Sequence, residues 1–278
     1  MLKKLKRKIK SVLFPEKKGW IFKEITNYNF KMLLNLDSFL DYKLYKNNEY
    51  ETETLHCIDR LIKNYNIGNV WFIDIGSNIG LMSLYVSKKY PTIKVDAFEP
   101  VTINFSQNYL NKKINNLEYD LHKLLIGSKI SNEEKIYLND DVITTEQNKM
   151  NYGMSSIYTN EFHSGKKFET CKMITFDAFI KEYKKEEFLK KASLIFKIDV
   201  EGAEIDVIKG MKELLASKNE MTFVMELLFE DSYEKCIEVI HFLKTFAFSL
   251  FDLNGNLISE NNFKQLKDSE YVFQKNKI

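Results

Sequence analysis

The chain has 278 residues, a length that suits one large domain or one domain with a modest appendage. Its residues are 44% hydrophobic and 29% charged, which excludes a chain that is disordered by composition. The net charge is +2, but residues 1–18 hold eight lysines and arginines against one glutamate, a local charge of +7 that leaves −5 for the rest. An acidic body argues against broad nucleic-acid binding, because that function needs a basic face on the folded domain.

The three cysteines lie far apart and form no Cys-x-x-Cys pair. This usage fits buried thiols in a reducing cytoplasm and predicts neither a zinc site nor a disulfide framework. No run of about 18 apolar residues occurs, so no membrane-spanning helix is expected. The basic N-terminus is followed by neither a long apolar core nor a small-residue cleavage site, so we expect no secretory signal peptide and a cytoplasmic location.

The first residues place apolar side chains at helical spacing with lysines between them, which predicts a short basic amphipathic helix that ends before Pro15. Residues 1–14 therefore suit peripheral contact with a partner or with an anionic membrane at its inner face, and a solvated terminus is the alternative. Residues 20–65 are also predicted to be helical and to cap the main sheet. We divide the chain into an N-terminal part, residues 1–65, and a domain over residues 66–278.

Strand and helix patterns alternate from residue 70 onward. The alternation predicts right-handed β-α-β units, and therefore a Rossmann-like α/β fold with a mostly parallel sheet and helices on both faces. Residues 126–176 interrupt the rhythm and are interpreted as an insertion over the ligand-binding edge. The predicted strands are 70–75, 94–98, 119–125, 194–200, 222–228 and a closing antiparallel pair, 248–253 with 270–274; the predicted helices are 81–89, 101–113, 181–191, one through Ile205 to Leu215 and one through Cys236 to Leu243.

A glycine-containing turn joins the first of these strands to its helix. It reads Asp74-Ile-Gly76-Ser77-Asn78-Ile-Gly80. A ligand must approach such a turn closely, and glycine has no Cβ that would block it. Asp74, at the carboxyl end of the strand, can hold a cationic ammonium group or orient the loop. We therefore predict that these five named residues bind a cofactor.

Glu99 ends the next strand and can accept two hydrogen bonds from ribose hydroxyls. The dinucleotide fingerprint G-x-G-x-x-G is absent, and the lack of a G-K-[ST] sequence excludes a P-loop. A carboxylate at Asp74 would repel a pyrophosphate, whereas S-adenosylmethionine (SAM) carries an ammonium and a sulfonium and no phosphate. The acidic edge therefore favours SAM over NAD as the cofactor.

A second polar segment, Lys197-Ile-Asp199-Val-Glu201-Gly-Ala-Glu204, ends the fourth strand of the predicted sheet. The carboxyl ends of parallel strands form the ligand-binding edge, so three carboxylates and a lysine would gather there. Carboxylates in such places usually have perturbed pKa values. Acids at a helix N-terminus also suit the helix dipole without any chemistry, an explanation that fits Glu204 but fits Lys197 and Asp199 poorly.

The strings DIGSNIG, AFEP and KIDVEGAE together resemble the signature of FkbM-type SAM-dependent methyltransferases. The similarity extends over roughly residues 50–230 and includes Tyr50-Glu51 and Val224-Met225-Glu226. It implies the class I methyltransferase fold, with a seven-stranded sheet whose last strand is antiparallel, and O-methylation, often of a sugar hydroxyl. The chain departs from the family at Ser77, where many relatives have alanine, and over residues 126–176, where the similarity is patchy.

A sugar hydroxyl needs a base that removes its proton as it attacks a methyl group. Asp199 is the first candidate, with Glu201 and Glu226 behind it because they lie at the same edge. His163 in the insertion is a further candidate, since its unperturbed pKa suits the role, although a loop histidine is more often a surface residue. Asp199 with Glu201 or Glu226 could instead bind Mg²⁺; we predict SAM as the cofactor and no metal.

The remaining site candidates concern the acceptor. Lys197 could neutralise the acidic cluster or contact an anionic acceptor, and Ser155 and Ser156 could hydrogen-bond a sugar or form an ordinary turn. The resemblance implies a small-molecule or glycan acceptor, as in bacterial capsule or lipopolysaccharide biosynthesis, and here the glycan rests on the family alone. The alternatives are an NAD-dependent oxidoreductase or epimerase and a non-catalytic scaffold that docks on membranes through residues 1–14.

Overall fold

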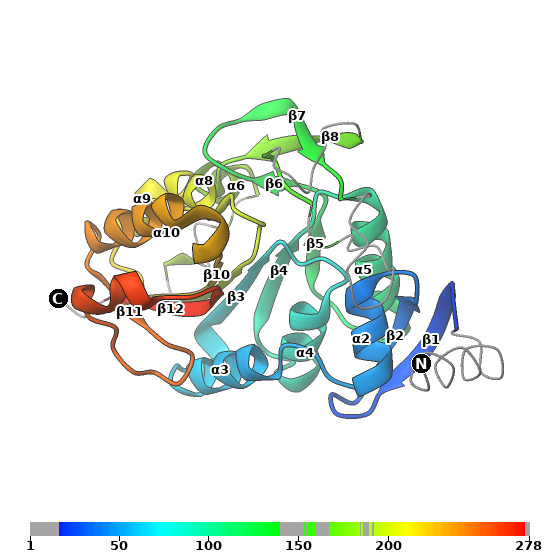
Figure 1. The fold of residues 1–278 in the computed structure, drawn as a ribbon. Helices are drawn as coiled ribbons and strands as arrows, with labels where there is room; N and C mark the ends of the chain where they lie inside the picture. The colour runs from blue at the N-terminus through cyan, green and yellow to red at the C-terminus, as the bar shows by residue number, and fades with distance from the viewer. Residues whose placement is uncertain are drawn as a thin grey trace, which may run out of the picture.

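A computed structural model of the chain describes residues 17–139, 153, 155–158, 167–183, 185, 189–190 and 192–275. Its central sheet has seven strands in the order β11-β12-β10-β9-β3-β4-β5 (Figure 1). Neighbouring strands are parallel except at β12, which is antiparallel to β10 and to β11. The predicted Rossmann-like fold with an antiparallel last strand is confirmed. The strands are β3 Val70–Ile75, β4 Lys94–Phe98, β5 Asp120–His122, β9 Ser193–Ile198, β10 Met221–Leu227, β11 Phe248–Phe251 and β12 Ser269–Lys275.

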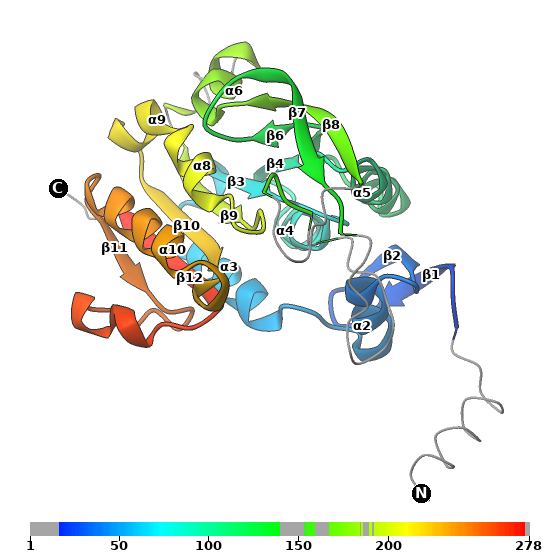
Figure 2. The same cartoon turned by 45° about the horizontal axis from the view of Figure 1, so that its top comes forward.

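The sheet separates two hydrophobic clusters, because successive side chains of a strand point to opposite faces. On β3, Trp71, Ile73 and Ile75 pack with apolar side chains of α6, α8 and α10, whereas Val70 and Phe72 pack with those of α3 and α4. Helices therefore cover both faces of the sheet (Figure 2). The helices are α3 Thr52–Lys63, α4 Leu81–Lys89, α5 Thr102–Ile114, α6 Phe176–Glu182, α8 Glu204–Lys209, α9 Lys212–Ala216 and α10 Phe229–Lys244.

The structure forms a β-hairpin over residues 20–35, so the helical prediction for residues 20–65 is wrong at its start. The amphipathic helix predicted over residues 1–14 lies outside the described residues. In the second strand the buried side chains Phe30, Met32 and Leu34 recur at every second position, which is the period of a strand and not of a helix. The helices predicted for the rest of this part, α2 and α3, are present. The elements before α3 are β1 Trp20–Ile25, β2 Phe30–Asn35 and α2 Phe39–Asn47.

Three amide side chains of α5 bind the edge of β2 that β1 leaves unpaired. Asn115 accepts a hydrogen bond from Lys31 N at 2.8 Å. Asn111 accepts one from Leu33 N at 2.7 Å, and Gln107 donates one to Leu33 O at 2.9 Å. The amides are four residues apart, so they lie in a row on one face of the helix. This row, the α5 amide row, satisfies backbone groups that a further strand would otherwise pair.

The insertion after β5 forms a three-stranded sheet in the order β6-β8-β7. Helix α6 follows it where no helix was predicted, and the Thr175 hydroxyl caps it by accepting a hydrogen bond from Ala178 N at 3.1 Å. The helix predicted over residues 181–191 lies partly outside the described residues. The predicted strand 119–125 is split into β5 and β6. The strands are β6 Leu125–Ile126, β7 Ser131–Tyr137 and β8 Phe168–Ile174, which lie at the top of Figure 1.

Three further expectations concern the whole chain. Cys57, Cys171 and Cys236 are buried free thiols, as predicted. In the ranges that the structure describes, no helix is both long and apolar enough to cross a membrane. The division of the chain at residue 65 stays a prediction; α3 packs its apolar side chains into the same cluster as one face of the sheet.

Candidate active site

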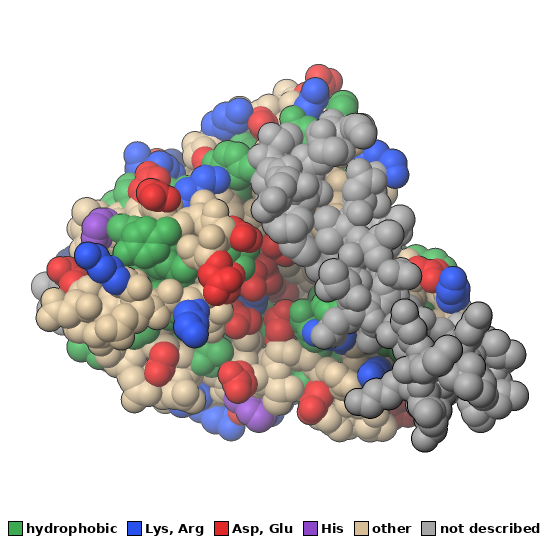
Figure 3. Space-filling model, in the orientation of Figure 1, with side chains coloured by type: hydrophobic (Ala, Val, Ile, Leu, Met, Phe, Trp, Pro, Cys, Tyr) green, Lys and Arg blue, Asp and Glu red, His purple; other side chains and the backbone are tan. Residues whose placement is uncertain are grey.

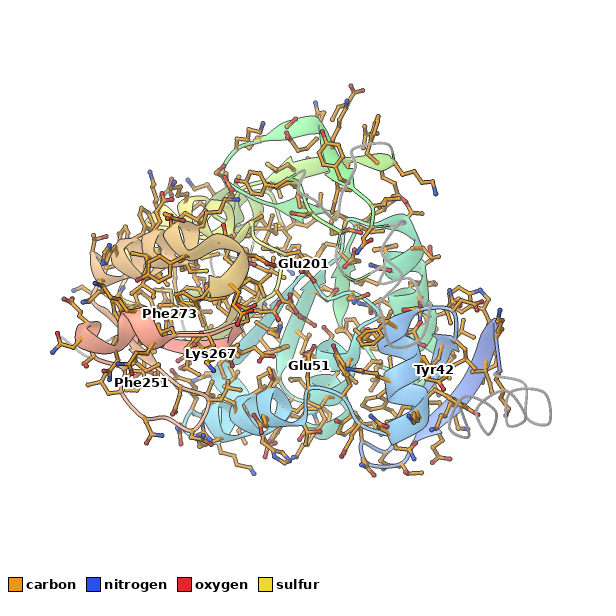
Figure 4. All side chains as sticks on the ribbon, in the orientation of Figure 1. Tyr42, Glu51, Glu201, Phe251, Lys267 and Phe273 are labelled. Carbon is orange, nitrogen blue, oxygen red and sulfur yellow. The ribbon has the colours of Figure 1, made fainter. Side chains whose placement is uncertain are left out.

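A pocket lies at the carboxyl ends of β3, β4, β9 and β10, the edge where parallel sheets bind ligands. Figure 3 shows acidic side chains gathered around a recess in the middle of this face. In Figure 4, Glu51 and Glu201 face the same central space from the start of α3 and from the β9–α8 connection. The pocket brings together most of the predicted site residues, namely Asp74, Gly76, Ser77, Asn78, Glu99, Ser155, Ser156, Lys197, Asp199, Glu201 and Glu226.

The two glycines of the turn after β3 adopt positive φ angles, 82° at Gly76 and 90° at Gly80. A Cβ on Gly76 would lie 1.8 Å from the backbone oxygen of Asp199, and one on Gly80 would lie 2.4 Å from Asn108 Oδ1. The sequence predicted that glycine is needed here so that a ligand can approach the turn. The structure shows instead that protein atoms occupy the positions where the two Cβ atoms would lie. Gly76 borders the pocket, whereas Gly80 forms the N-cap of α4 outside its lining.

Glu99 binds the glycine turn from the end of β4. Its two carboxyl oxygens accept hydrogen bonds from the backbone amides of Asn78 and Val101, each at 2.8 Å. Burial raises the pKa of this carboxyl to about 7. Each carboxylate oxygen has a second lone pair, so Glu99 can still accept hydrogen bonds from the hydroxyls of a bound ribose.

Asp74 is buried at the end of β3, with 2% of its surface exposed. It accepts a hydrogen bond from the Ser83 hydroxyl, and its register partner on β9 is Lys197. Burial raises the pKa of Asp74 to about 6. Its carboxylate can hold an ammonium group, as predicted from its place in the sequence.

These two carboxyls predict opposite pH dependences for stability and for SAM affinity. The folded pKa of Glu99, about 7, lies above its ordinary 4.5, so its stabilising contribution is complete below pH 4.5 and is lost as the pH rises through 7. Affinity for cationic SAM should instead rise between about pH 5 and 7, because only ionised Asp74 attracts the ammonium. Calorimetric titrations at several pH values check this, and the Asp74→Asn variant should give a flatter profile. A wild-type affinity that does not change with pH would contradict it.

A compact charged cluster lies opposite the glycine turn. The Lys197 ammonium is 2.8 Å from Asp199 Oδ2, with 3% of the lysine side chain and 25% of the aspartate side chain exposed. A hydrogen bond links Asp199 to Glu226, and Glu201 lies beside them. The prediction that Lys197 neutralises the acidic cluster fits this ion pair, and its contact with an acceptor stays a prediction.

The carboxyls of this cluster differ in ionisation. Burial alone would raise the pKa of Asp199, but the adjacent Lys197 ammonium outweighs it and holds the pKa below its usual range. The charge of Asp199, with burial, raises the pKa of Glu226 to about 10. Burial and the charge of Asp199 also hold the pKa of Glu201 well above its usual range. At neutral pH, Asp199 is therefore the ionised member of the three and accepts a hydrogen bond from neutral Glu226.

The sequence assigned no role to Glu51, which belongs to this site. It adopts a positive φ of 49° as the N-cap of α3, and its side chain lines the pocket. Burial raises its pKa to about 7, against the opposing effect of Lys197. In the sequence, Glu51 is marked only by the family resemblance of the string Tyr50-Glu51. Its left-handed backbone, which is uncommon for a residue other than glycine, is visible only in the structure.

The insertion contributes the wall of the pocket opposite Glu51. Ser156 pairs with Tyr137 of β7 through two backbone hydrogen bonds, and its hydroxyl donates to Glu201 O at 2.8 Å. Ser155 is next to it in the lining. Both serines are thus near the cluster, and their contact with a sugar stays a prediction. His163, a predicted alternative base, lies outside the described residues.

The three carboxyls of the cluster also meet the spacing of a metal site. One oxygen from each of Asp199, Glu201 and Glu226 lies within 4.8 Å of the others. Lys197 already supplies a buried positive charge at this place. The expectation of no metal ion stays a prediction.

The α5 amide row extends to the glycine turn. Asn111 donates to Ile79 O at 3.0 Å while it accepts from Leu33 N, so one side chain joins the turn to the hairpin. Asn108, on the same helix, donates to Ser77 Oγ at 3.0 Å and to Asn78 O at 3.2 Å. Asn108 and Asn111 thus stabilise the conformation of the turn by hydrogen bonding to it from α5. The sequence showed them only as polar positions in an expected helix.

Replacement of Asn111 by alanine should destabilise the protein by about 2 kcal/mol, because two backbone groups lose their buried partner. SAM affinity should fall several-fold, since the turn loses a contact that sets its shape. Asn115→Ala is the matched control: it removes hydrogen bonds to Lys31 but none to the turn. Thermal unfolding and SAM titration of both variants check this, and equal losses of SAM affinity would contradict it.

The chemistry of the pocket fits SAM. Its described lining holds six carboxyl side chains and one lysine. Glu201 and Glu226 are neutral and Lys197 balances Asp199. Asp74, with a pKa of about 6, is mostly ionised at neutral pH, and its charge suits a cationic ligand and would repel a pyrophosphate. Asp74 would hold the ammonium and Glu99 the ribose. Apolar side chains beside Glu99 offer a surface for an adenine ring; they include Phe98, Val101, Leu124 and Leu125.

The fold and this site define a class I SAM-dependent methyltransferase. Residues 74–262 match the methyltransferase FkbM domain, and the chain belongs to that family. The enzyme is therefore an FkbM-type methyltransferase with SAM as its cofactor. This identification replaces the NAD-dependent and non-catalytic alternatives.

The chain is similar to two named methyltransferases and to a solved structure. The chain is 30% identical over 179 residues to methyltransferase sdnD of Sordaria araneosa, covering 59% of this chain and 67% of that protein. It is 26% identical over 193 residues to methyltransferase 1 of Beauveria bassiana, covering 62% and 73%. A similar solved structure is M. jannaschii TYW2 in complex with AdoMet, with 11% identity, a TM-score of 0.40, and coverage of 93% and 86%.

Proposed function

We propose that the enzyme methylates a hydroxyl of a sugar, in the cytoplasmic steps of a bacterial surface polysaccharide pathway such as capsule or lipopolysaccharide biosynthesis. The observation that carries the proposal is an ionised Asp199 beside two neutral carboxyls at the edge of the SAM pocket. A hydroxyl acceptor needs a base, whereas a neutral amine attacks without one. The neighbouring Glu201 and Glu226 can exchange hydrogen bonds with the other hydroxyls that a sugar carries.

When bound, SAM supplies a methyl group that its sulfonium already activates. The chain must then place the acceptor oxygen in line with that methyl group and take its proton. Asp199 is the group that accepts the proton, because it is ionised and partly exposed to the pocket. Lys197 and Glu226 orient its carboxylate by hydrogen bonding to it.

The insertion is the proposed acceptor wall. Ser155 and Ser156 line the pocket from this segment, and a sugar hydroxyl next to the one that reacts would hydrogen-bond to Ser155 or Glu201. Lys197 is surrounded by carboxyls that raise its pKa well above the usual value, despite its burial, so it remains a cation that could contact an anionic acceptor. His163 stays the alternative base.

The test is a calorimetric titration with SAM and its demethylated product, followed by a screen of sugar nucleotides and glycans for methyl transfer. We expect binding of both cofactor forms and methylation at a hydroxyl. Failure to bind either form would overturn the cofactor assignment. Transfer to an amine or thiol, or to a hydroxyl of a compound without a sugar, would overturn the sugar acceptor and leave the cofactor assignment intact.

A further inference from the structure

The first residue of α3 carries a carboxyl group that the fold leaves without a hydrogen bond. Glu51 is the N-cap of this helix, a position whose side chain usually accepts a hydrogen bond from the first helical turn. Its carboxyl makes no such bond and lines the pocket instead. Within the ranges that the structure describes, no other group hydrogen-bonds to it. A mostly buried carboxyl in this condition gives up its hydration on folding, and a ligand in the pocket can supply the missing contact.

One side chain of the hairpin holds the backbone on both sides of Glu51. The Tyr28 hydroxyl donates a hydrogen bond to Tyr50 O at 3.1 Å and accepts one from Tyr50 N at 3.2 Å. The same hydroxyl is 3.3 Å from Thr52 Oγ1, within hydrogen-bonding distance. Between these anchors Glu51 has a φ of 49° and a ψ of 41°, a left-handed conformation that is unfavourable for a residue with a Cβ. The fold therefore fixes Glu51 in a strained conformation from which its side chain faces the pocket (Figure 4).

The surroundings of the Glu51 carboxyl are mostly acidic. Lys197 attracts it, but that ammonium is already paired with Asp199 at 2.8 Å. Burial raises the pKa of Glu51 to about 7 and that of Asp74 to about 6, so both carboxyls carry negative charge near neutral pH. A further cation between them would be attracted by both. The titratable groups that act on Glu51 come from β3, from β9 and the segment after it, from β12 and from the preceding residue: Asp74, Lys197, Asp199, Glu201, Glu270 and Tyr50.

We propose that Glu51 binds the ammonium group of SAM together with Asp74. An ammonium has three hydrogen-bond donors, so it can bind both carboxylates at once. Both carboxyls line the pocket, and the charge of Asp74 acts on Glu51. The methyl acceptor is the weaker partner for Glu51, because the insertion that carries Ser155 and Ser156 forms the opposite wall of the pocket.

The Glu51→Gln variant tests the assignment, because it keeps the size of the side chain and removes its charge. Calorimetric titration of the full-length protein should show at least a tenfold higher Kd for SAM and for its demethylated product, since both carry the ammonium. The Kd for methylthioadenosine, which has the nucleoside and the sulfur but lacks the amino-acid part, should stay within about twofold. The matched control is Glu53→Gln: this carboxyl is exposed in the first turn of α3 and does not line the pocket, so all three ligands should bind as they do to the wild type.

A second measurement is the number of protons released when SAM binds at pH 7, obtained from titrations in buffers with different ionisation enthalpies. The pKa of Glu51 is about 7, so about half of these carboxyls carry a proton that a bound cation must expel. Asp74, with a pKa of about 6, contributes little at this pH. The wild type should therefore release roughly half a proton more than Glu51→Gln does.

Several outcomes would overturn the proposal. A loss of affinity for SAM alone would place Glu51 at the sulfonium, and equal losses for all three ligands would show that it only supports the fold of the pocket. An unchanged Kd for SAM in Glu51→Gln, or equal proton release by this variant and the wild type, would show that its carboxyl does not bind the ammonium. The assays use no methyl acceptor, so their result is independent of the sugar acceptor proposed above.

Discussion

Replacement of Asp199 by asparagine is expected to lower kcat by roughly 10²–10⁴-fold, the usual loss when a general base is removed. Asparagine keeps the size of the side chain but cannot take a proton. The backbone oxygen that approaches Gly76 is unchanged, so the shape of the SAM loop is kept and the Kd for SAM should stay within about threefold. The measurements are kcat with the acceptor that the screen identifies and the calorimetric Kd for SAM.

Glu226→Gln is the matched control for this prediction. Neutral Glu226 donates a hydrogen bond to Asp199, and a glutamine amide can donate one as well, so a loss of less than about tenfold in kcat is expected. If the Asp199→Asn variant kept its activity, another group would be the base. If the two variants lost activity equally, Asp199 and Glu226 would both take part in proton transfer, and Asp199 alone would not be the base.

The sequence was most informative at the ends of the strands. Asp74, Glu99 and Asp199 each stand at or next to the carboxyl end of a predicted strand, and parallel strands bring their carboxyl ends to one edge whatever the loops do. Their approximate places in the site therefore followed from topology. The ionisation of each carboxyl did not, because it depends on distances such as the 2.8 Å between Lys197 and Asp199.

The structure of the N-terminal part was harder to predict because it depends on contacts with residues that are far away in the sequence. β2 is stabilised by amides of α5 more than 70 residues later, and local spacing carries no sign of that contact. Glu51 reaches the pocket only through the left-handed backbone at the start of α3. A motif can mark such a residue, but the reason for its presence appears only in three dimensions.

Gly76→Ala is expected to have the second large effect, on binding and stability together. Its φ of 82° disfavours any residue with a Cβ, and that Cβ would overlap the backbone oxygen of Asp199 at 1.8 Å. Backbone cannot rotate away as a side chain can, so the turn and the end of β9 must separate. We expect a loss of roughly 3 kcal/mol or more in stability and of about 100-fold or more in SAM affinity.

Gly255→Ala isolates the backbone contribution to that effect. Gly255 has a similar φ of 91°, but no atom lies within 4 Å of the position of its Cβ, and it does not line the pocket. Its replacement should cost about 1 kcal/mol of stability and leave SAM binding unchanged. Thermal unfolding and SAM titration of the two variants therefore separate strain from overlap. Equal effects in both would mean that the contact between Gly76 and Asp199 does not hold the two halves of the site together.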